Sequence, residues 1–221
     1  MDTLGFLQRV LPSEGIYCTI VVEGESLSQA FYNTVGELEQ ALTSLDKRKR
    51  NVYYATSAFQ TKQSRKQSNV RATKSLYMDI DCGEGKDYPS QREGLLALVK
   101  FVKDTGLPDP MVVSSGNGLH VYWVLTRELE PTEWQPIANA MKQCAQDQGF
   151  KQDMAVPSDS ARVLRAIGTH NPKGGKMAKL LVDRQPVELE SITKCLKGYI
   201  TTARGFKKSM GSTLLANMAV E

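Results

Sequence analysis

The chain alternates between segments with the two-residue period of a β-strand and segments with the apolar spacing of a helix. Strand-like runs lie at residues 15–24, 51–59, 75–82, 110–115, 119–126 and 178–184. Helical spacing is found at residues 34–50, 90–106 and 131–149. Thr34 and Ser90 begin the first two helical segments, each with glutamate three residues later, as in a capping box. This alternation predicts a mixed α+β fold (mixed α/β) whose helices cover a sheet.

Composition narrows the class of protein. The 221 residues are 41% hydrophobic and 24% charged, as is usual for one large domain or two small lobes of a globular protein. A net charge of +4 would suit a polyanionic partner. The four cysteines contain no C-x-x-C pair and there are two histidines, which argues against a zinc cluster or a disulfide framework. The N-terminus, MDTLGFLQRVLP, predicts neither a signal peptide nor a membrane span, so we expect a cytoplasmic protein without a membrane partner.

The segment 60–74 is rich in basic residues and has no apolar period. It contains Lys62, Arg65, Lys66, Arg71 and Lys74. We interpret it as a mobile basic loop between two strands.

Two aspartates lie one residue apart inside the run SLYMDIDC. Side chains alternate between the faces of a strand, so Asp79 and Asp81 share one face while Met78 and Ile80 share the other. We expect the apolar face to pack and the acidic face to be displayed. Carboxylates about 6.5 to 7 Å apart at Cα can converge on two cations held about 3.5 to 4 Å from each other. The alternative is a solvated acidic pair at a sheet edge.

A glycine-rich turn connects the next two strand-like runs. The Gly-Asn-Gly sequence at 116–118 predicts a hairpin, and His120 in its second arm lies on the face opposite Leu119 and Val121. An imidazole beside a turn that a ligand can approach closely is suited to phosphate oxygens. The alternative is a half-buried histidine that bonds a neighbouring carbonyl group.

The segment 152–176 concentrates polar residues. Asp153 would add a third carboxylate, and Arg162, Arg165 and Lys173 could neutralise phosphates. The alternative is a surface loop of salt bridges. No G-x-x-x-x-G-K-[ST] pattern passes through its glycines, so an ATP-driven motor has no support.

Together, three motifs resemble the archaeo-eukaryotic primase (AEP) superfamily, in its prim-pol (primase-polymerase) branch of phage and plasmid replication proteins. They are MDID, SGNGLH, and an aspartate followed by R-x-x-R-x-x-G-T-x-N-x-K, in that order between residues 69 and 176. The resemblance implies an RNA-recognition-motif-like (RRM-like) catalytic sheet packed with an N-terminal α/β lobe, with the active site in the cleft between them. It implies one catalytic domain over 1–221, with N-terminal lobe elements at 1–70, the motif-bearing core at 71–185 and a C-terminal helical segment at 186–221.

The resemblance also implies a role for each matching residue. The metal-binding carboxylates would be Asp79, Asp81 and Asp153, with Asp159 as a rival for the third position. His120 would hold the phosphates of the incoming nucleotide. Further nucleotide or template contacts would come from Ser115, Arg162, Arg165 and Lys173. The chain departs from the motif at Ile167, where proline is usual.

The activity implied is template-dependent nucleotidyl transfer, as a DNA primase and/or DNA polymerase. Two Mg²⁺ or Mn²⁺ ions, nucleoside triphosphates (NTP or dNTP), and a single-stranded DNA template with a primer would be required. The segment 62–74 and Arg204, Lys207 and Lys208 are predicted to follow the template backbone. The ending GSTLLANMAVE has no clear finishing element, which suggests a fragment of a longer protein that carries a replicative helicase or a primase accessory domain.

Three alternatives remain open from the sequence. A metal-dependent nuclease or other phosphodiesterase could use the same carboxylates. An inactive module could bind single-stranded DNA or a replication origin. A small basic α/β domain could have no nucleic-acid role at all.

Overall fold

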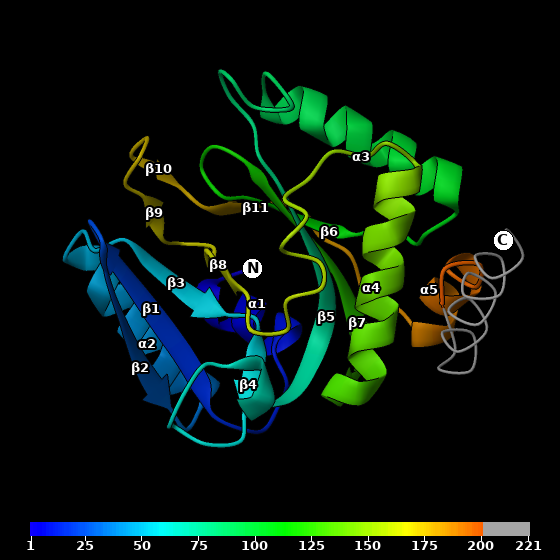
Figure 1. The fold of residues 1–221 in the computed structure, drawn as a ribbon. Coiled ribbons are helices and arrows are strands. Elements are labelled where there is room, and N and C mark those ends of the chain that lie inside the picture. The colour runs from blue at the N-terminus through cyan, green and yellow to red at the C-terminus, as the bar shows by residue number, and fades with distance from the viewer. Residues whose placement is uncertain (201–221) are drawn as a thin grey trace, which may run out of the picture.

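A computed structural model describes residues 1–200 as two antiparallel sheets with helices around them (Figure 1). Arg204, Lys207 and Lys208 lie outside the described residues, as does the end of the predicted C-terminal helical segment. The predicted mixed α+β class is confirmed. Within residues 1–200, no helix is both long and apolar enough to cross a membrane.

The first sheet belongs mainly to the N-terminal part of the chain and has the strand order β2-β1-β3-β8. Its strands are β1 (Tyr17–Glu23), β2 (Ser26–Tyr32), β3 (Val52–Ala55) and β8 (Val163–Leu164). Helix α2 (Val35–Lys47) packs against this sheet, and helix α1 (Thr3–Val10) packs against α2 and β7. Because β8 comes from the later part of the chain, this lobe is completed by residues far from it in sequence.

The second sheet has the order β11-β6-β7-β5-β4. Its strands are β4 (Ser57–Phe59), β5 (Val70–Ile80), β6 (Met111–Ser114), β7 (Leu119–Leu129) and β11 (Lys179–Val182). Its helices are α3 (Gln91–Thr105), α4 (Pro131–Asp147) and α5 (Leu189–Cys195). A 3₁₀ turn, η1 (Gln67–Asn69), precedes β5, and a separate hairpin pairs β9 (His170–Asn171) with β10 (Lys176–Met177).

The predicted helices begin where their capping residues place them. Thr34 Oγ accepts a hydrogen bond from the Glu37 amide at 3.1 Å, and Ser90 Oγ accepts one from the Arg92 amide at 3.2 Å. Helix α3 ends at Gly106, whose φ of 71° is the left-handed conformation that glycine adopts without steric cost.

Two local predictions are wrong, and two elements were missed. Residues 70–74 of the predicted loop belong to β5, and Asn69 bonds the carbonyls of Thr61 and Ser64, so the preceding turn is also anchored. The predicted strand 51–59 is divided at Thr56 between the two sheets. Strand β2 and helix α1 were not predicted, because β2 is a mostly exposed edge strand with no apolar alternation and α1 spans 8 residues.

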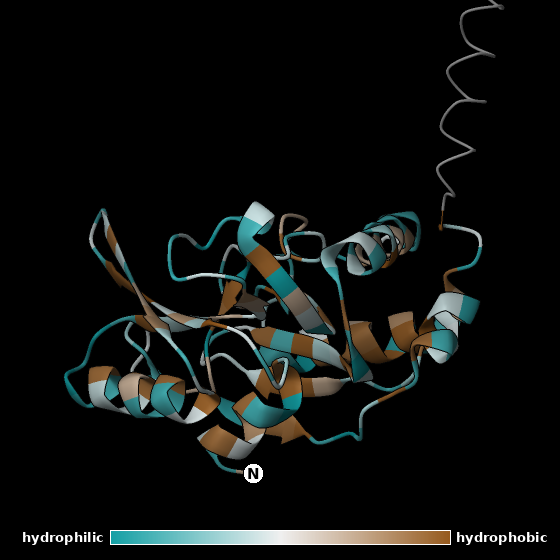
Figure 2. Cartoon of the chain, turned by 90° about the horizontal axis from the view of Figure 1, so that it is seen from below, coloured by the Kyte–Doolittle hydropathy of each residue, from teal (hydrophilic) through white to brown (hydrophobic). Residues whose placement is uncertain are grey.

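An aromatic core joins the two sheets. The Tyr54 hydroxyl donates to the Tyr122 hydroxyl across the interface at 3.0 Å, and the Phe6 ring lies edge-on to both, at 6.0 and 5.7 Å. The strand face that carries Tyr77 is therefore covered by the first lobe. The expectation of a displayed acidic face is right for Asp81, which is 56% exposed, and wrong for Asp79, which is 20% exposed. Figure 2 colours the residues by hydropathy, and apolar and polar residues alternate along the strands and around the helices.

The β6–β7 turn packs tightly against the end of β5. A Cβ at Gly118 would overlap the Ile80 carbonyl oxygen, and backbone atoms cannot swing aside as a long side chain can. We expect Gly118→Ala to lower the free energy of unfolding by about 1–3 kcal/mol, measured by urea denaturation. Gly36→Ala is the matched control, because its nearest neighbour is Thr34 Oγ at 3.9 Å. A Gly118→Ala protein as stable as the control would contradict this packing.

Candidate active site

The pairing of β5 with β7 places two of the sequence motifs side by side. Asp79 lies directly opposite His120 in the register, and His120 Nε2 is 3.9 Å from Asp79 Oδ1. Only 6% of the His120 side chain and 20% of the Asp79 side chain are exposed. The two groups therefore face each other in a largely water-excluded place between the sheets.

Asp153 is anchored beside Asp79 by the main chain. Its amide donates to the Asp79 carbonyl at 2.9 Å, on the strand edge that short β4 does not cover. Its carboxylate accepts a hydrogen bond from Arg162 Nη2 at 2.8 Å. Asp81 follows the end of β5 and is paired with Lys86 Nζ at 3.0 Å. Each of these two carboxylates thus has one cationic partner.

Asp159 lies in a different environment. Its carboxylate accepts hydrogen bonds from Gln67 Nε2 and the Ala161 amide, both at 3.0 Å, and its carbonyl accepts one from the Tyr77 hydroxyl at 2.7 Å. Through these hydrogen bonds Asp159 holds its loop in place. The geometry therefore favours Asp153 over Asp159 as the carboxylate nearest Asp79.

The environment shifts the ionisation of both facing groups. Burial, and then the charge of Asp81, raises the pKa of Asp79 to about 7. Burial, and then the positive charge of Arg165, lowers the pKa of His120 to about 3, so the imidazole is neutral at pH 7.

Several buried polar atoms within residues 1–200 have no hydrogen-bond partner, and two of them belong to the candidate site residues His120 and Arg162. Among the described residues, these atoms are Arg65 Nε, His120 Nδ1, Gln152 Oε1 and Arg162 Nε. Buried polar groups are normally paired, so each of these atoms has room for a hydrogen bond from an ordered water molecule or a ligand. Gln152 was not predicted, because a lone glutamine beside an aspartate carries no sequence signal.

The remaining predicted residues are engaged elsewhere. Ser115 Oγ accepts a hydrogen bond from the Gly118 amide at 3.2 Å and closes the turn. The Arg165 guanidinium bonds the Val52 and His170 carbonyls at 3.1 and 2.8 Å, and it lies 4.4 Å from the centre of the Tyr53 ring. It therefore connects β3 to the β9–β10 hairpin. Lys173 is exposed at the end of that hairpin. Nucleotide contacts by these three residues stay predictions.

The donor atoms suit a hard divalent cation. Carboxylate oxygens are the ligands that Mg²⁺ and Mn²⁺ prefer. Within residues 1–200, no three His, Cys, Asp or Glu side chains gather closely enough to form a ready-made cluster. Lys86 and Arg162 instead compensate the charges of Asp81 and Asp153. The donor set fits the metal chemically, because a carboxylate oxygen can bind a cation while the same carboxylate accepts a hydrogen bond from Lys86 or Arg162.

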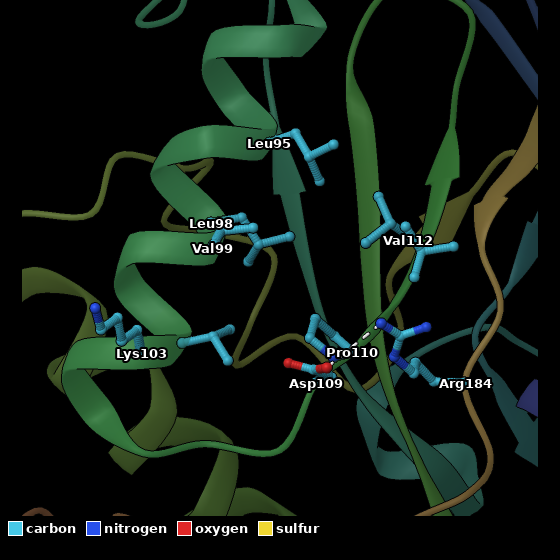
Figure 3. Close-up of a pocket in the computed structure, with 10 residues that line it drawn as sticks. Leu95, Leu98, Val99, Lys103, Asp109, Pro110, Val112 and Arg184 are labelled. Carbon is cyan, nitrogen blue, oxygen red and sulfur yellow. Dashed lines mark hydrogen bonds and ion pairs between the residues drawn. The ribbon is translucent and has the colours of Figure 1, made fainter.

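A separate apolar cavity of about 360 Å³ lies between α3 and the β6–β11 edge of the sheet (Figure 3). Leu98, Val99 and Val112 line it, and Asp109 and Arg184 form an ion pair at 3.4 Å beside it. None of the predicted site residues lines this cavity.

No protein-family model matches the chain, and no curated protein matches it. Solved structures do. The AEP domain of the primase-polymerase of cyanophage S-2L superposes with a TM-score of 0.64 and 14% identity, over 88% of this chain and 96% of that one. Primase RepB′ superposes with a TM-score of 0.59 and 14% identity, over 99% of this chain and 69% of that one. The catalytic domain of RepB′ in complex with initiator DNA gives 0.54 and 12%, over 99% and 97%.

The chain therefore has the fold of AEP primase-polymerase catalytic domains. The resemblance inferred from the three motifs is confirmed at the level of the fold.

The raised pKa of Asp79 predicts a pH-dependent stability. The folded protein holds this proton more tightly than the unfolded chain, so the contribution is favourable at low pH and is lost as pH rises through about 7. We expect Asp79→Asn to raise the free energy of unfolding at pH 8 by about 2–4 kcal/mol in chelator-treated protein. At pH 4 the difference should vanish.

Urea denaturation at both pH values measures this effect. Asp104→Asn is the control, because the Asp104 carboxylate is exposed on α3 and its change should be small at both pH values. An Asp79→Asn protein less stable than wild type at pH 8 would show that the Asp79 charge is not penalised by its surroundings.

Proposed function

We propose that the protein is a template-dependent nucleotidyltransferase, acting as a DNA primase and/or DNA polymerase of the prim-pol type. The observation that supports this most is the meeting of Asp79, Asp153 and His120 on neighbouring main-chain segments, with His120 Nδ1 buried and unpartnered. Acidic oxygens beside an unused imidazole nitrogen suit a nucleotide whose phosphates are bridged by cations.

In this proposal Asp79, Asp81 and Asp153 would hold two Mg²⁺ or Mn²⁺ ions. When bound, such ions activate the attacking 3′-hydroxyl group and stabilise the departing pyrophosphate. Asp79 would contribute as a carboxylate, and a nearby positive charge lowers the pKa of a buried acid.

The protein's own groups would position the nucleotide. His120 is neutral at pH 7, and with its proton on Nδ1 the ring can donate to a phosphate oxygen. Arg162 has an unpartnered Nε and holds Asp153 through Nη2, so its guanidinium can bond a phosphate without leaving that carboxylate. Lys86, which pairs with Asp81, lies in the β5–α3 connection, where Gly83 and Gly85 have positive φ. In this proposal Lys86 would bring a further positive charge to the phosphates.

The proposed partners are a single-stranded DNA template with a primer, and NTP or dNTP. One structural neighbour was solved with initiator DNA. A replicative helicase, in the same protein or separate, and Lys173 as a nucleotide contact complete the proposal.

The first test is incorporation of labelled nucleotides on single-stranded DNA, with and without primer, in Mg²⁺ and in Mn²⁺. We expect Asp79→Ala/Asp81→Ala to reduce incorporation at least about 100-fold, because these groups would stabilise charge in the transition state. Asp104→Ala, which removes an exposed carboxylate on α3, should leave incorporation unchanged. Products formed without a primer would show that the protein also starts new chains.

Other outcomes would favour other functions. Shortened DNA that requires a divalent ion but no triphosphate would favour a nuclease. DNA binding without any product would favour a binding module.

The third carboxylate can be tested separately. We expect Asp153→Asn to lower incorporation at least about 100-fold and Asp159→Asn less than about 10-fold, because only Asp153 is bonded beside Asp79. Urea denaturation of both variants separates activity from stability, since each carboxylate also holds its loop. The reverse order of effects would transfer the third position to Asp159.

A further inference from the structure

A second cavity, of about 610 Å³ and lined mainly by polar and charged residues, lies between the end of α2 and the β9–β10 hairpin. Lys47, Lys49 and Arg50 line one side, and His170 and Asn171 line the other. In Figure 1 the hairpin lies above the sheet of β1 and β3 and to the left of the β6–β7 turn. The volume is within the range of small-molecule sites in proteins.

The charges around this cavity are unequally compensated. Asp46 is used by His170, which bonds it through both its amide, at 2.6 Å, and Nδ1, at 2.8 Å. Arg50 is paired with Glu23. Within residues 1–200, Lys47 and Lys49 form no ion pair, so two uncompensated ammonium groups remain at the rim. With Nδ1 held by Asp46, His170 has Nε2 left for a ligand.

The conformation of Lys49 is a second observation. The Lys49 amide bonds the Asp46 carbonyl at 2.8 Å and the Arg50 amide bonds the Leu45 carbonyl at 3.1 Å, which is the Schellman pattern of a helix end. Lys49 occupies its left-handed position, with φ of 59°, where glycine is most common. A lysine held in this disfavoured conformation, with its side chain at a cavity, suggests a function for the ammonium group.

Hydrogen bonds connect the cavity lining to segments that carry candidate site residues. Asn171 Nδ2 donates to the Ser115 carbonyl at 3.0 Å, in the turn that leads to His120. The Arg165 guanidinium bonds the His170 carbonyl at 2.8 Å and Asn51 Oδ1 at 2.7 Å. A molecule in the cavity therefore lies next to the segment that carries the proposed nucleotide-binding residues.

We propose that this cavity binds phosphate groups through Lys47, Lys49 and His170. Ammonium groups and an imidazole around a polar cavity recognise phosphate oxygens. The phosphate belongs either to a single-stranded nucleic acid or to a nucleotide. The inference deepens the proposed function and rests on it, because a nucleotidyltransferase would bind both a nucleic-acid strand and a nucleotide.

The test uses Lys49→Gly, because glycine fits the left-handed position and the fold should be retained or stabilised. The matched control is Lys197→Gly, which removes an equal charge from an exposed turn after α5. Binding of a fluorescein-labelled single-stranded oligonucleotide is measured from about 50 to 200 mM salt, because counterion release changes the affinity strongly over this range. Binding of dATP is measured in parallel by calorimetry.

We expect Lys49→Gly to weaken binding of one probe about 3- to 10-fold, and Lys197→Gly to change neither. Loss of oligonucleotide affinity, with a salt slope smaller by about 0.7, assigns the cavity to the nucleic-acid strand. Loss of dATP affinity assigns it to the nucleotide. Unchanged affinity for both probes in Lys49→Gly and in Lys47→Ala/Lys49→Gly overturns the proposal.

Binding is also measured for Lys49→Gly in the Asp79→Ala/Asp81→Ala background, where incorporation is expected to be lost. The effect of Lys49 on binding is then measured independently of incorporation, which separates this inference from the proposed function. A Lys49 effect on binding that persists while wild type shows no incorporation would retain the phosphate site and reject the polymerase. Incorporation by wild type without a Lys49 effect on either probe would do the reverse.

Discussion

The register between β5 and β7 is the constraint on which the candidate site depends. Asp79 faces His120 only in this alignment, and a slip of one residue would turn every side chain of β5 to the other face. Buried groups on both faces, such as Met78 and Tyr77, make any such slip costly. The aromatic core and the position of the acidic site are therefore fixed by the same pairing.

This pairing has an electrostatic cost that neighbouring cations offset. Asp79 is held in a place that disfavours its charge, beside a histidine that burial keeps neutral. Arg162 and Lys86 compensate the two other carboxylates. Two of the three carboxylates are thus paired with cations, while His120 Nδ1 and Arg162 Nε beside them have no hydrogen-bond partner among the described residues.

Much of the fold and part of the site were predictable from the sequence. Capping residues and apolar spacing located the helices 34–50 and 90–106, and two-residue alternation located the central strands. Edge strand β2 was missed because its exposed side chains need no apolar period. The motifs singled out Asp79 and His120 as candidate site residues, and the structure brings them together; their burial could not be predicted, because it depends on the other lobe.

Contacts between distant segments could not be predicted. Nothing in the local sequence distinguishes Asp153, which is bonded to Asp79, from Asp159, which is bonded to Gln67. The use of Arg165 to join β3 to a hairpin depends on tertiary structure in the same way. Such differences between similar residues arise only when the chain has folded.

The segment 153–164 connects the two sheets and is bonded to both of them. At its start, Asp153 is bonded to the edge of β5, and at its end Val163–Leu164 pairs with β3 of the other sheet. Between them, the Arg162 carbonyl accepts hydrogen bonds from both the amide and the hydroxyl group of Thr56, where the chain itself crosses between sheets. A hinge motion of one lobe against the other would therefore pull on Arg162 and Asp153 together, so that the shape of the acidic site and the angle between the lobes are mechanically coupled.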